Sequence, residues 1–437
     1  MKNNILKLFV LFYISSITLN AEVLTFSKAY ELGLDNSNTI QSSNYQNESR
    51  KQRVEQVKAE LYPQISASLS YSDTRHEYNR LRQYKDYYIT EKSTDYNISL
   101  SQVIYNPEIM TRIESEKVRV KLSEVDNLIK KQELAQVVLK AYLDVLKSKN
   151  KLTLIESYVQ YNRFQFDLIE KKFKMNLATK MDYLQAKVDL DTSNLELNKE
   201  QGLFKVYKIK LTNIIGKTDL IIPNFNLLQS NYALLKEMQN IVSNKEKYIT
   251  NLEIQQAQFG IEVTKKDIDS AYSGHLPKLN FDMSYTKFDS TATTPDYENT
   301  QRAMVTLRIP LYQGGLVDAK INEAKLNYKA ANADYNEVEN EIKARHDELL
   351  TMFSTSIYSV GLYKETLETT QLYLDSVIMG VDNGLKSIVD VQDAKYKLNE
   401  VQYKYIENVY NMMDAYIGLL IVTNNFEELR LLDKVFL

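Results

Sequence analysis

Residues 383–394 read Asn383-Gly384-Leu385-Lys386-Ser387-Ile388-Val389-Asp390-Val391-Gln392-Asp393-Ala394. Asn-Gly is a helix-stop and turn signal, because both residue types tolerate a positive φ. Ser387 can cap a new helix, and Asp390 lies three residues later, where a capping box places its acid. The stretch therefore predicts a tight turn between two helices.

Apolar residues recur every seven positions after this turn, which is the spacing of a coiled-coil seam: Val391, Leu398, Tyr405, Met412 and Leu419. A matching set lies 208 residues earlier, since 391 − 183 = 208: Tyr183, Leu190, Leu197, Phe204 and Leu211. The pattern predicts two helical hairpin tips, at about 176–182 and 383–390. A gated tip and a plain turn between coiled-coil helices are both possible interpretations, and these residues alone favour the plain turn.

The composition excludes several classes of protein and site. With 437 residues but only 11 Gly and 6 Pro, the chain favours a few very long elements. Its 57 acidic and 54 basic residues include no basic stripe, so we expect no nucleic-acid partner. Cysteine is absent, which excludes disulfides and thiolate metal sites. The three histidines lie far apart, and no nucleophile–base pair, phosphate loop or metal-ligand spacing is present. We expect neither an enzyme nor a bound cofactor.

The first 21 residues resemble a secretory signal peptide. Lys2 and Lys7 provide the positive start, residues 8–14 are apolar, and Ala21 can precede the cleavage site. No later apolar stretch approaches the length of a transmembrane helix. We therefore expect an exported chain that crosses any membrane by β-strands.

Four segments change to the strand period of two. Residues 64–72 alternate polar and apolar without an error, which gives one apolar face and one hydroxyl-bearing face. The predicted strands cover about 63–72, 95–104, 278–288 and 301–311. They belong to two repeats of helix, β-hairpin, long helix, turn and helix, with these bounds: signal peptide 1–21, first repeat 22–216, connector 217–231, second repeat 232–422 and C-terminal tail 423–437. The long helical pattern after residue 107 has no Gly or Pro, and we expect at least one break, near Lys147–Lys151.

Strands with one apolar face and this length suit a bilayer, in which a tilted strand needs about 9–11 residues. A sheet in lipid must close, and bacterial barrels begin at about 8 strands. Four strands cannot close alone, so several copies of the chain would share one barrel. A soluble β-sandwich edge packed on helices is the alternative. The helices are amphipathic, so we expect them to lie in water and to continue the barrel as a tunnel across the periplasm.

The chain resembles the TolC-like outer-membrane efflux proteins over nearly its whole mature length. Three stretches carry the resemblance: 384–394 at the second tip, Ile309-Pro310-Leu311-Tyr312-Gln313-Gly314-Gly315, and Leu61-Tyr62-Pro63-Gln64. It implies a mainly α-helical homotrimer with a small β part. The three copies would form one outer-membrane barrel of about 12 strands and a coiled-coil tunnel that tapers at the tips. The connector and the tail would be equatorial, and the protein would lie in the outer membrane of a Gram-negative bacterium.

The resemblance also assigns roles to residues at the tips. Asp390, Asp393 and Asp182 would form the acidic pore constriction. Lys386 would belong to a latch between neighbouring helices, although lysine cannot make the two-pronged bond of arginine. Val381 stands where the family has a tyrosine, and it cannot form a hydrogen bond. The tips would dock an adaptor through Leu177, Ala178, Gly384 and Leu385. Leu177-Ala178 stands where the family often has Gly-Leu.

These inferences together predict the outer-membrane exit duct of a tripartite efflux system. Its partners would be two further copies of the chain, a periplasmic membrane-fusion adaptor, an inner-membrane transporter and outer-membrane lipid. One alternative within transport is the outer-membrane component of a type I protein secretion system. An alternative of another class is a secreted trimeric coiled-coil adhesin or structural protein, which would conduct no ions.

Overall fold

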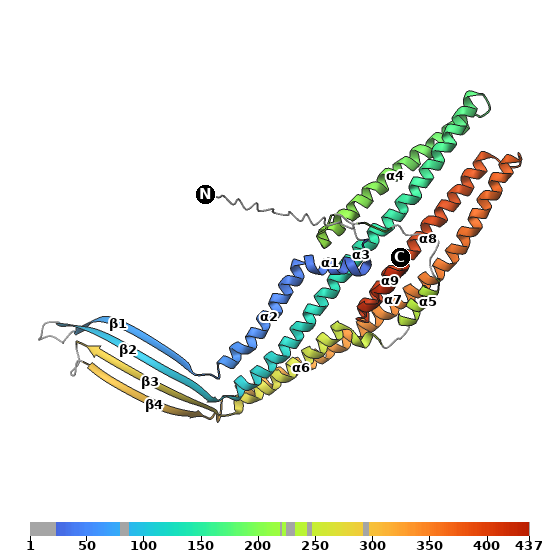
Figure 1. Cartoon of the computed structure of the whole chain (residues 1–437). Helices are drawn as coiled ribbons and strands as arrows, with labels where there is room; N and C mark the ends of the chain where they lie inside the picture. Colours follow the sequence, from blue (N-terminus) through green and yellow to red (C-terminus); the bar gives the residue numbers. More distant parts are fainter. Residues whose placement is uncertain are drawn as a thin grey trace, which may run out of the picture.

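The computed structural model describes residues 23–78, 87–218, 221–223, 232–242, 247–291 and 297–436. It is mainly α-helical with one small antiparallel sheet. The sheet forms one end of an elongated molecule, and two helical hairpin tips form the other end (Figure 1). The predicted signal peptide and most of the connector 217–231 lie outside the described residues.

The same order of elements occurs twice along the chain. The first series is α1 (Phe26–Asn36), α2 (Asn38–Ala59), β1 (Gln64–Tyr78), β2 (Tyr87–Tyr105), α3 (Pro107–Lys174) and α4 (Lys180–Ile215). The second series is α5 (Tyr232–Val242), α6 (Leu252–Tyr272), β3 (Lys278–Ser290), β4 (Tyr297–Arg308), α7 (Leu316–Asp382) and α8 (Ile388–Val422). The tail then adds a short helix, α9 (Leu429–Phe436).

The strands differ in length from those predicted. β1 and β2 extend beyond the apolar alternation, because backbone pairing continues from Asp73↔Lys92 to Tyr78↔Tyr87. β3 is slightly longer than predicted, whereas β4 begins earlier and stops at Arg308. The prediction that residues 309–311 are strand was therefore wrong. Pro310 has no backbone N–H to donate to the ladder.

α3 is one unbroken helix of 68 residues, so the predicted break near Lys147–Lys151 was wrong. Lysine is a good helix former, and the segment lacks Gly and Pro. Two of its lysines instead make contacts outside the helix. Lys147 Nζ lies 3.6 Å from a carboxylate oxygen of Glu407, and Lys149 Nζ donates to the Ile222 carbonyl at 2.6 Å. At 1.5 Å per residue, α3 spans about 100 Å from the sheet to the first tip.

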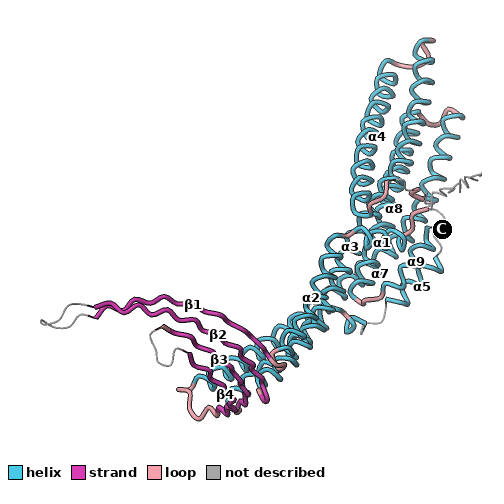
Figure 2. Tube along the Cα trace, turned by 60° about the vertical axis from the view of Figure 1, so that its left-hand side comes forward, coloured by secondary structure: helices cyan, strands magenta, loops and turns pink. Residues whose placement is uncertain are grey.

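The sheet has the order β1-β2-β3-β4 and is curved (Figure 2). One face carries the small hydroxyl residues, which pair across strands. Ser66 Oγ lies 2.8 Å from Ser99 Oγ, and Ser101 Oγ donates to Asp282 at 2.7 Å. The other face is apolar and exposed to solvent in the single chain, as Ile65 at 72% illustrates. The two faces predicted from the alternation are therefore present.

The helices next to the sheet repeat its order. α2 packs on α3, α3 on α6, and α6 on α7. The sheet and the helix layer therefore end on the same two sides. β1 and α2 are outermost on one side, and β4 and α7 are outermost on the other (Figure 1).

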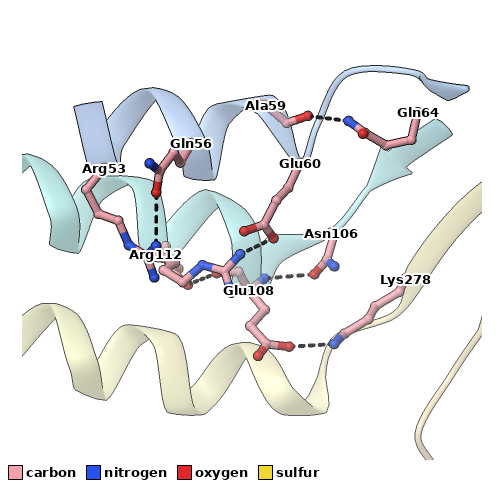
Figure 3. Close-up of polar contacts among 10 residues, drawn as sticks. Arg53, Gln56, Ala59, Glu60, Gln64, Asn106, Glu108, Arg112 and Lys278 are labelled. Carbon is pink, nitrogen blue, oxygen red and sulfur yellow. Dashed lines mark hydrogen bonds and ion pairs between the residues drawn. The ribbon is translucent and has the colours of Figure 1, made fainter. Parts of the chain in front are cut away.

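A polar network joins the sheet to the helices (Figure 3). Asn106 caps α3 by accepting the N–H of Glu108 at 3.2 Å. The Glu108 carboxylate accepts from Lys278 at the start of β3 at 2.5 Å, which holds the pKa of Glu108 below its usual value. Arg112 binds Glu60 at the end of α2. Three of the passages between helix and sheet are therefore tied to one another.

The main apolar core extends from mid-height along α7 and α8 to the second tip, and it contains the large buried rings of Tyr142, Phe353 and Tyr416. The C-terminal helix α9 closes it. Asp433 of α9 accepts the Phe26 N–H at 2.6 Å and the Ser27 hydroxyl at 2.5 Å, so it caps the start of α1 from a distant part of the chain. The two ends of the described chain are thereby joined at this level.

Candidate functional site

The first tip is a Schellman turn at the end of α3. Asn176 adopts a left-handed conformation with φ 58°. The Asn176 N–H donates to the Phe173 carbonyl at 3.0 Å, and the Leu177 N–H donates to the Lys172 carbonyl at 2.7 Å. These two bonds pair carbonyls that the end of the helix would otherwise leave without a donor.

The second tip has the same backbone at the end of α7. Gly384 has φ 73°, its N–H donates to the Val381 carbonyl at 3.0 Å, and the Leu385 N–H donates to the Gly380 carbonyl at 2.8 Å. The structural counterpart of Gly384 is therefore Asn176, not Leu177. The prediction from the sequence placed Leu177 at the position of this glycine, one residue too late. The glycine position holds Asn176, because asparagine also tolerates the left-handed conformation.

Each second helix begins with a capping box. In the first tip, Thr179 Oγ1 accepts the Asp182 N–H at 3.1 Å, and Asp182 Oδ2 accepts the Thr179 N–H at 2.9 Å. In the second, Ser387 Oγ accepts the Asp390 N–H at 3.2 Å, and Asp390 Oδ2 accepts the Ser387 N–H at 2.7 Å. The cap predicted at Ser387 is confirmed.

The caps hold two of the three predicted constriction carboxylates in their charged form. Hydrogen bonds from the hydroxyl and the backbone of Thr179 lower the pKa of Asp182. Bonds from the backbone and the hydroxyl of Ser387, with a smaller contribution from nearby Lys386, lower the pKa of Asp390. Both aspartates therefore have a local structural role as helix caps.

The third carboxylate, Asp393, is exposed, and within the described part of the chain it makes no hydrogen bond or ion pair. It lies one turn after Asp390 on α8. Asp393 and Asp182 line the same cavity of about 310 Å³, which lies between α4 and the start of α8. The structure thus brings together two predicted site residues from different hairpins, whereas Asp390 does not line this cavity.

Lys386 lies within its own tip. Its Nζ is 3.7 Å from Asp390 Oδ1, and both side chains are partly exposed. Val381, at the position of the family tyrosine, is half-buried and packs against the main core. Within one chain, the ammonium group therefore contacts the cap of α8 rather than a neighbouring helix.

The leucines predicted to dock an adaptor are exposed, Leu177 at 71% and Leu385 at 81%. In a Schellman turn, the residue at the position of Leu177 and Leu385 is often covered by an apolar residue of the preceding helix turn. Here that position holds Lys172 in one tip and Gly380 in the other, which leave the leucines uncovered. Ala178 is half-buried and Gly384 is exposed.

Sequence reasoning missed two further tip residues, Met181 and Val389. They hold equivalent positions in the first turns of α4 and α8, are 76% and 55% exposed, and line the cavity between the hairpins. The sequence could have indicated them, because each first turn contains an apolar residue that lies outside the seven-residue seam.

The described residues contain no group of three His, Cys, Asp or Glu side chains placed to hold a metal ion. Within the same described ranges, no helix has both the length and the apolar character needed to span a bilayer.

The chain matches the family model of the outer membrane efflux protein over residues 29–217 and 247–425. Outer membrane protein TolC of Salmonella enteritidis is 25% identical over 298 residues, which cover 63% of this chain and 59% of that protein. Proteases secretion protein PrtF of Dickeya chrysanthemi is 20% identical over 293 residues, 62% of each chain. These alignments span less than two thirds of either relative.

The outer membrane channel CmeC of Campylobacter jejuni shares the fold with a TM-score of 0.75 and 14% identity, over 92% of this chain and 85% of that one. A crystal structure of CusC, described as forming a transmembrane channel, gives a TM-score of 0.74 and 13% identity, over 91% and 92%. The family model covers both repeats, including both tips and all four strands. The chain therefore belongs to the outer membrane efflux protein family.

Proposed function

We propose that this chain forms the outer-membrane exit duct of a tripartite efflux system, as a trimer that shares one β-barrel. The observation that carries the proposal is the four-stranded sheet with one exposed apolar face, one hydroxyl face and two open edges. An apolar face turned to lipid and a polar face turned to water are the arrangement of a membrane barrel that encloses a channel.

The pairing register supports strands that are tilted as in a barrel. Tyr71, Tyr96 and Tyr285 mark the outer ends of the apolar runs on β1, β2 and β3. Each pairs with a polar residue of the next strand: Thr94, Lys287 and Gln301. The apolar band therefore moves toward the helical end by two residues at each step, as tilted strands crossing a flat bilayer require.

The open edges support closure by identical copies. β1 and α2 lie at one edge, and β4 and α7 lie at the other. Head-to-tail contacts of this kind form a ring when the rotation closes. Three copies would supply about 12 strands, within the size range of bacterial barrels. Their long helices would then extend the channel into the periplasm.

The tips support a docking role. Leu177 and Leu385 are exposed apolar residues at the end of the molecule farthest from the sheet (Figure 1). A periplasmic adaptor would bind there and connect the duct to an inner-membrane transporter. Asp393, Asp182 and Asp390 would bring negative charge to this entrance and favour cations over anions, as acidic rings do in other channels.

The proposal is tested with the full-length protein purified in detergent. We expect a trimer by native mass spectrometry and discrete conductance steps in a planar bilayer. An Asp393→Ala, Asp390→Asn variant keeps an acceptor for the cap and weakens a closed entrance. A water-soluble monomer, or a trimer that conducts neither as wild type nor as this variant, would refute the channel and favour the adhesin.

A second candidate is the outer-membrane component of a type I protein secretion system, favoured by the similarity to Proteases secretion protein PrtF. A deletion strain separates the two functions. Efflux predicts greater susceptibility to small toxic compounds with an unchanged set of secreted proteins. Protein secretion predicts the loss of one exported protein with unchanged susceptibility.

A further inference from the structure

The two tips share their backbone but exchange a large and a small side chain at one contact. In the second tip, the Lys386 N–H donates to the Gly380 carbonyl at 3.1 Å, so residues 380 and 386 lie against each other. A Cβ atom on Gly380 would stand 2.8 Å from Lys386 Cγ and 3.3 Å from its Cβ. The equivalent positions of the first tip hold a large Lys172 and a small Ala178. Each tip therefore holds one long side chain at this pair of positions.

This contact fixes the direction of Lys386. The stem of the lysine lies on the bare helix surface at Gly380, and its Nζ reaches Asp390 Oδ1 at 3.7 Å. The close atom is Cγ, near the base of the side chain, so motion at the far end of the chain would not relieve a clash. A Cβ at position 380 would force Lys386 to rotate about χ1, away from Asp390.

Glycine at this position is itself a structural cost. In the interior of a helix glycine is less favourable than alanine by about 1 kcal/mol, and Gly380 still lies within α7. Gly361, in the middle of the same helix α7, would accept a Cβ with nothing within 4 Å. The two glycines differ in this respect, because only Gly380 has a neighbour that a methyl group would displace.

We infer that Gly380 is a positioning residue, which turns Lys386 onto the cap of its own helix. The second turn then holds its lysine paired with Asp390, while Asp393 has no partner among the described residues. The pairing itself is a property of the single chain. Its effect on ion passage rests on the proposed channel.

The pairing is tested by the rate at which an amine-acylating reagent modifies Lys386 in the full-length protein in detergent, measured by peptide mass spectrometry. Gly380→Ala should raise this rate about twofold, the size of effect expected from the loss of one exposed ion pair. Gly361→Ala is the matched control and should leave it unchanged. Lys180, in the other tip, serves as the internal reference for intact tips.

A double variant separates release of the lysine from general loosening of the turn. Asp390→Asn should also raise the Lys386 rate about twofold, because it removes the charge of the partner. Gly380→Ala combined with Asp390→Asn should be no faster than either single change, since both release the same ammonium group. Multiplying effects, or equal rates for Gly380→Ala and Gly361→Ala, would overturn the inference.

The bilayer gives a separate readout. If the tips form the entrance, separating the charges of Lys386 and Asp390 in Gly380→Ala changes the preference for cations, seen as a shift of the reversal potential in a salt gradient. A changed acylation rate with an unchanged reversal potential would uphold the positioning role and contradict the entrance. An unchanged acylation rate would overturn the positioning role whatever the conductance.

Discussion

Closure of the barrel predicts one specific contact between copies, between the open edges β1 and β4. The apolar band moves by two residues at each of the three strand pairs within the chain. One more step of the same size places Ser70 of one copy opposite Thr306 of the next, both on the hydroxyl face. The chain has no cysteine, so a Ser70→Cys, Thr306→Cys variant should form a disulfide between copies and no other.

Strand geometry makes the contact selective. Within one chain the two positions lie three strand spacings apart, about 14 Å across the sheet, which alone is too far for a disulfide. They are also offset along the strands, because Ser70 lies in line with Glu298, eight residues before Thr306. Moving the second cysteine to Met304 or Arg308 shifts it by about 7 Å along the strand and leaves the Cα atoms about 8 Å apart, beyond disulfide reach. Val305 is adjacent in sequence but points to the other face, so Ser70→Cys, Val305→Cys is the matched control.

Non-reducing electrophoresis after mild oxidation in membranes reads the result. A closed ring should give one covalent trimer band for the Thr306 variant and none for the Val305 control. Cross-linking with Met304 or Arg308 instead would preserve closure but contradict the extrapolated tilt. Equal cross-linking of both faces, no covalent product from any variant, or an open ladder of sizes would refute closure by identical copies.

Three further predictions concern the tips. Asp393→Ala should lower the cation preference of the channel about twofold in a reversal-potential measurement. A trimer loses three carboxylates, each of which attracts a cation about 10 Å away by roughly 0.4 kcal/mol in water, and salt at about 0.1 M reduces their sum about threefold. An unchanged potential would remove Asp393 from the entrance. Gly384→Ala should speed exchange of the Leu385 amide hydrogen about 5- to 30-fold, because a side chain at this positive φ costs about 1–2 kcal/mol; exchange at the wild-type rate would contradict the left-handed turn. The cap of α4 should weaken as the pH falls below about 4, because the pKa of Asp182 is lower in the folded protein than its ordinary value. The ionised Asp182 therefore stabilises the folded tip fully above the ordinary pKa, and this stabilisation is lost as the pH falls through the pKa of the folded protein. The rate of pepsin cleavage in the first tip of wild type, divided by the rate in Asp182→Ala at the same pH, should rise as the pH falls over this range. A ratio that does not change with pH would contradict the cap.

The sequence predicts the parts of this fold that repeat locally. Residues 64–72 alternate with period two, and the helix after Asp390 repeats with period seven, so each pattern identifies its own element. The seam of α8 is fully buried, from Val391 to Leu419, whereas in α4 only Leu211 of the equivalent set is buried. Periodicity shows which face is apolar, but how much of it is covered depends on neighbouring elements.

The wrong predictions concern features that depend on contacts between residues far apart in sequence or across a turn, which local sequence patterns do not specify. A cluster of lysines near Lys147 looks like a break, yet those lysines bind Glu407 and a carbonyl that lie far away in sequence. The cavity shared by Asp182 and Asp393 depends on how α4 lies beside α8, which no local pattern specifies. The contact between Gly380 and Lys386 depends on the Schellman turn, which folds the chain back over six residues.

The lengths of the two repeats show where the architecture is constrained. α3 has 68 residues and α7 has 67, a difference of about 1.5 Å in helices of about 100 Å. Both helices start at the sheet and end in a tip at the opposite end of the molecule, so the length of each is fixed at both ends (Figure 1). The β-hairpins have no such limit, since their outer ends are free: β1 and β2 have 15 and 19 residues, β3 and β4 only 13 and 12. In the proposed duct, a fixed distance between bilayer and adaptor would require matched helices and would leave the length of the outer hairpins unconstrained.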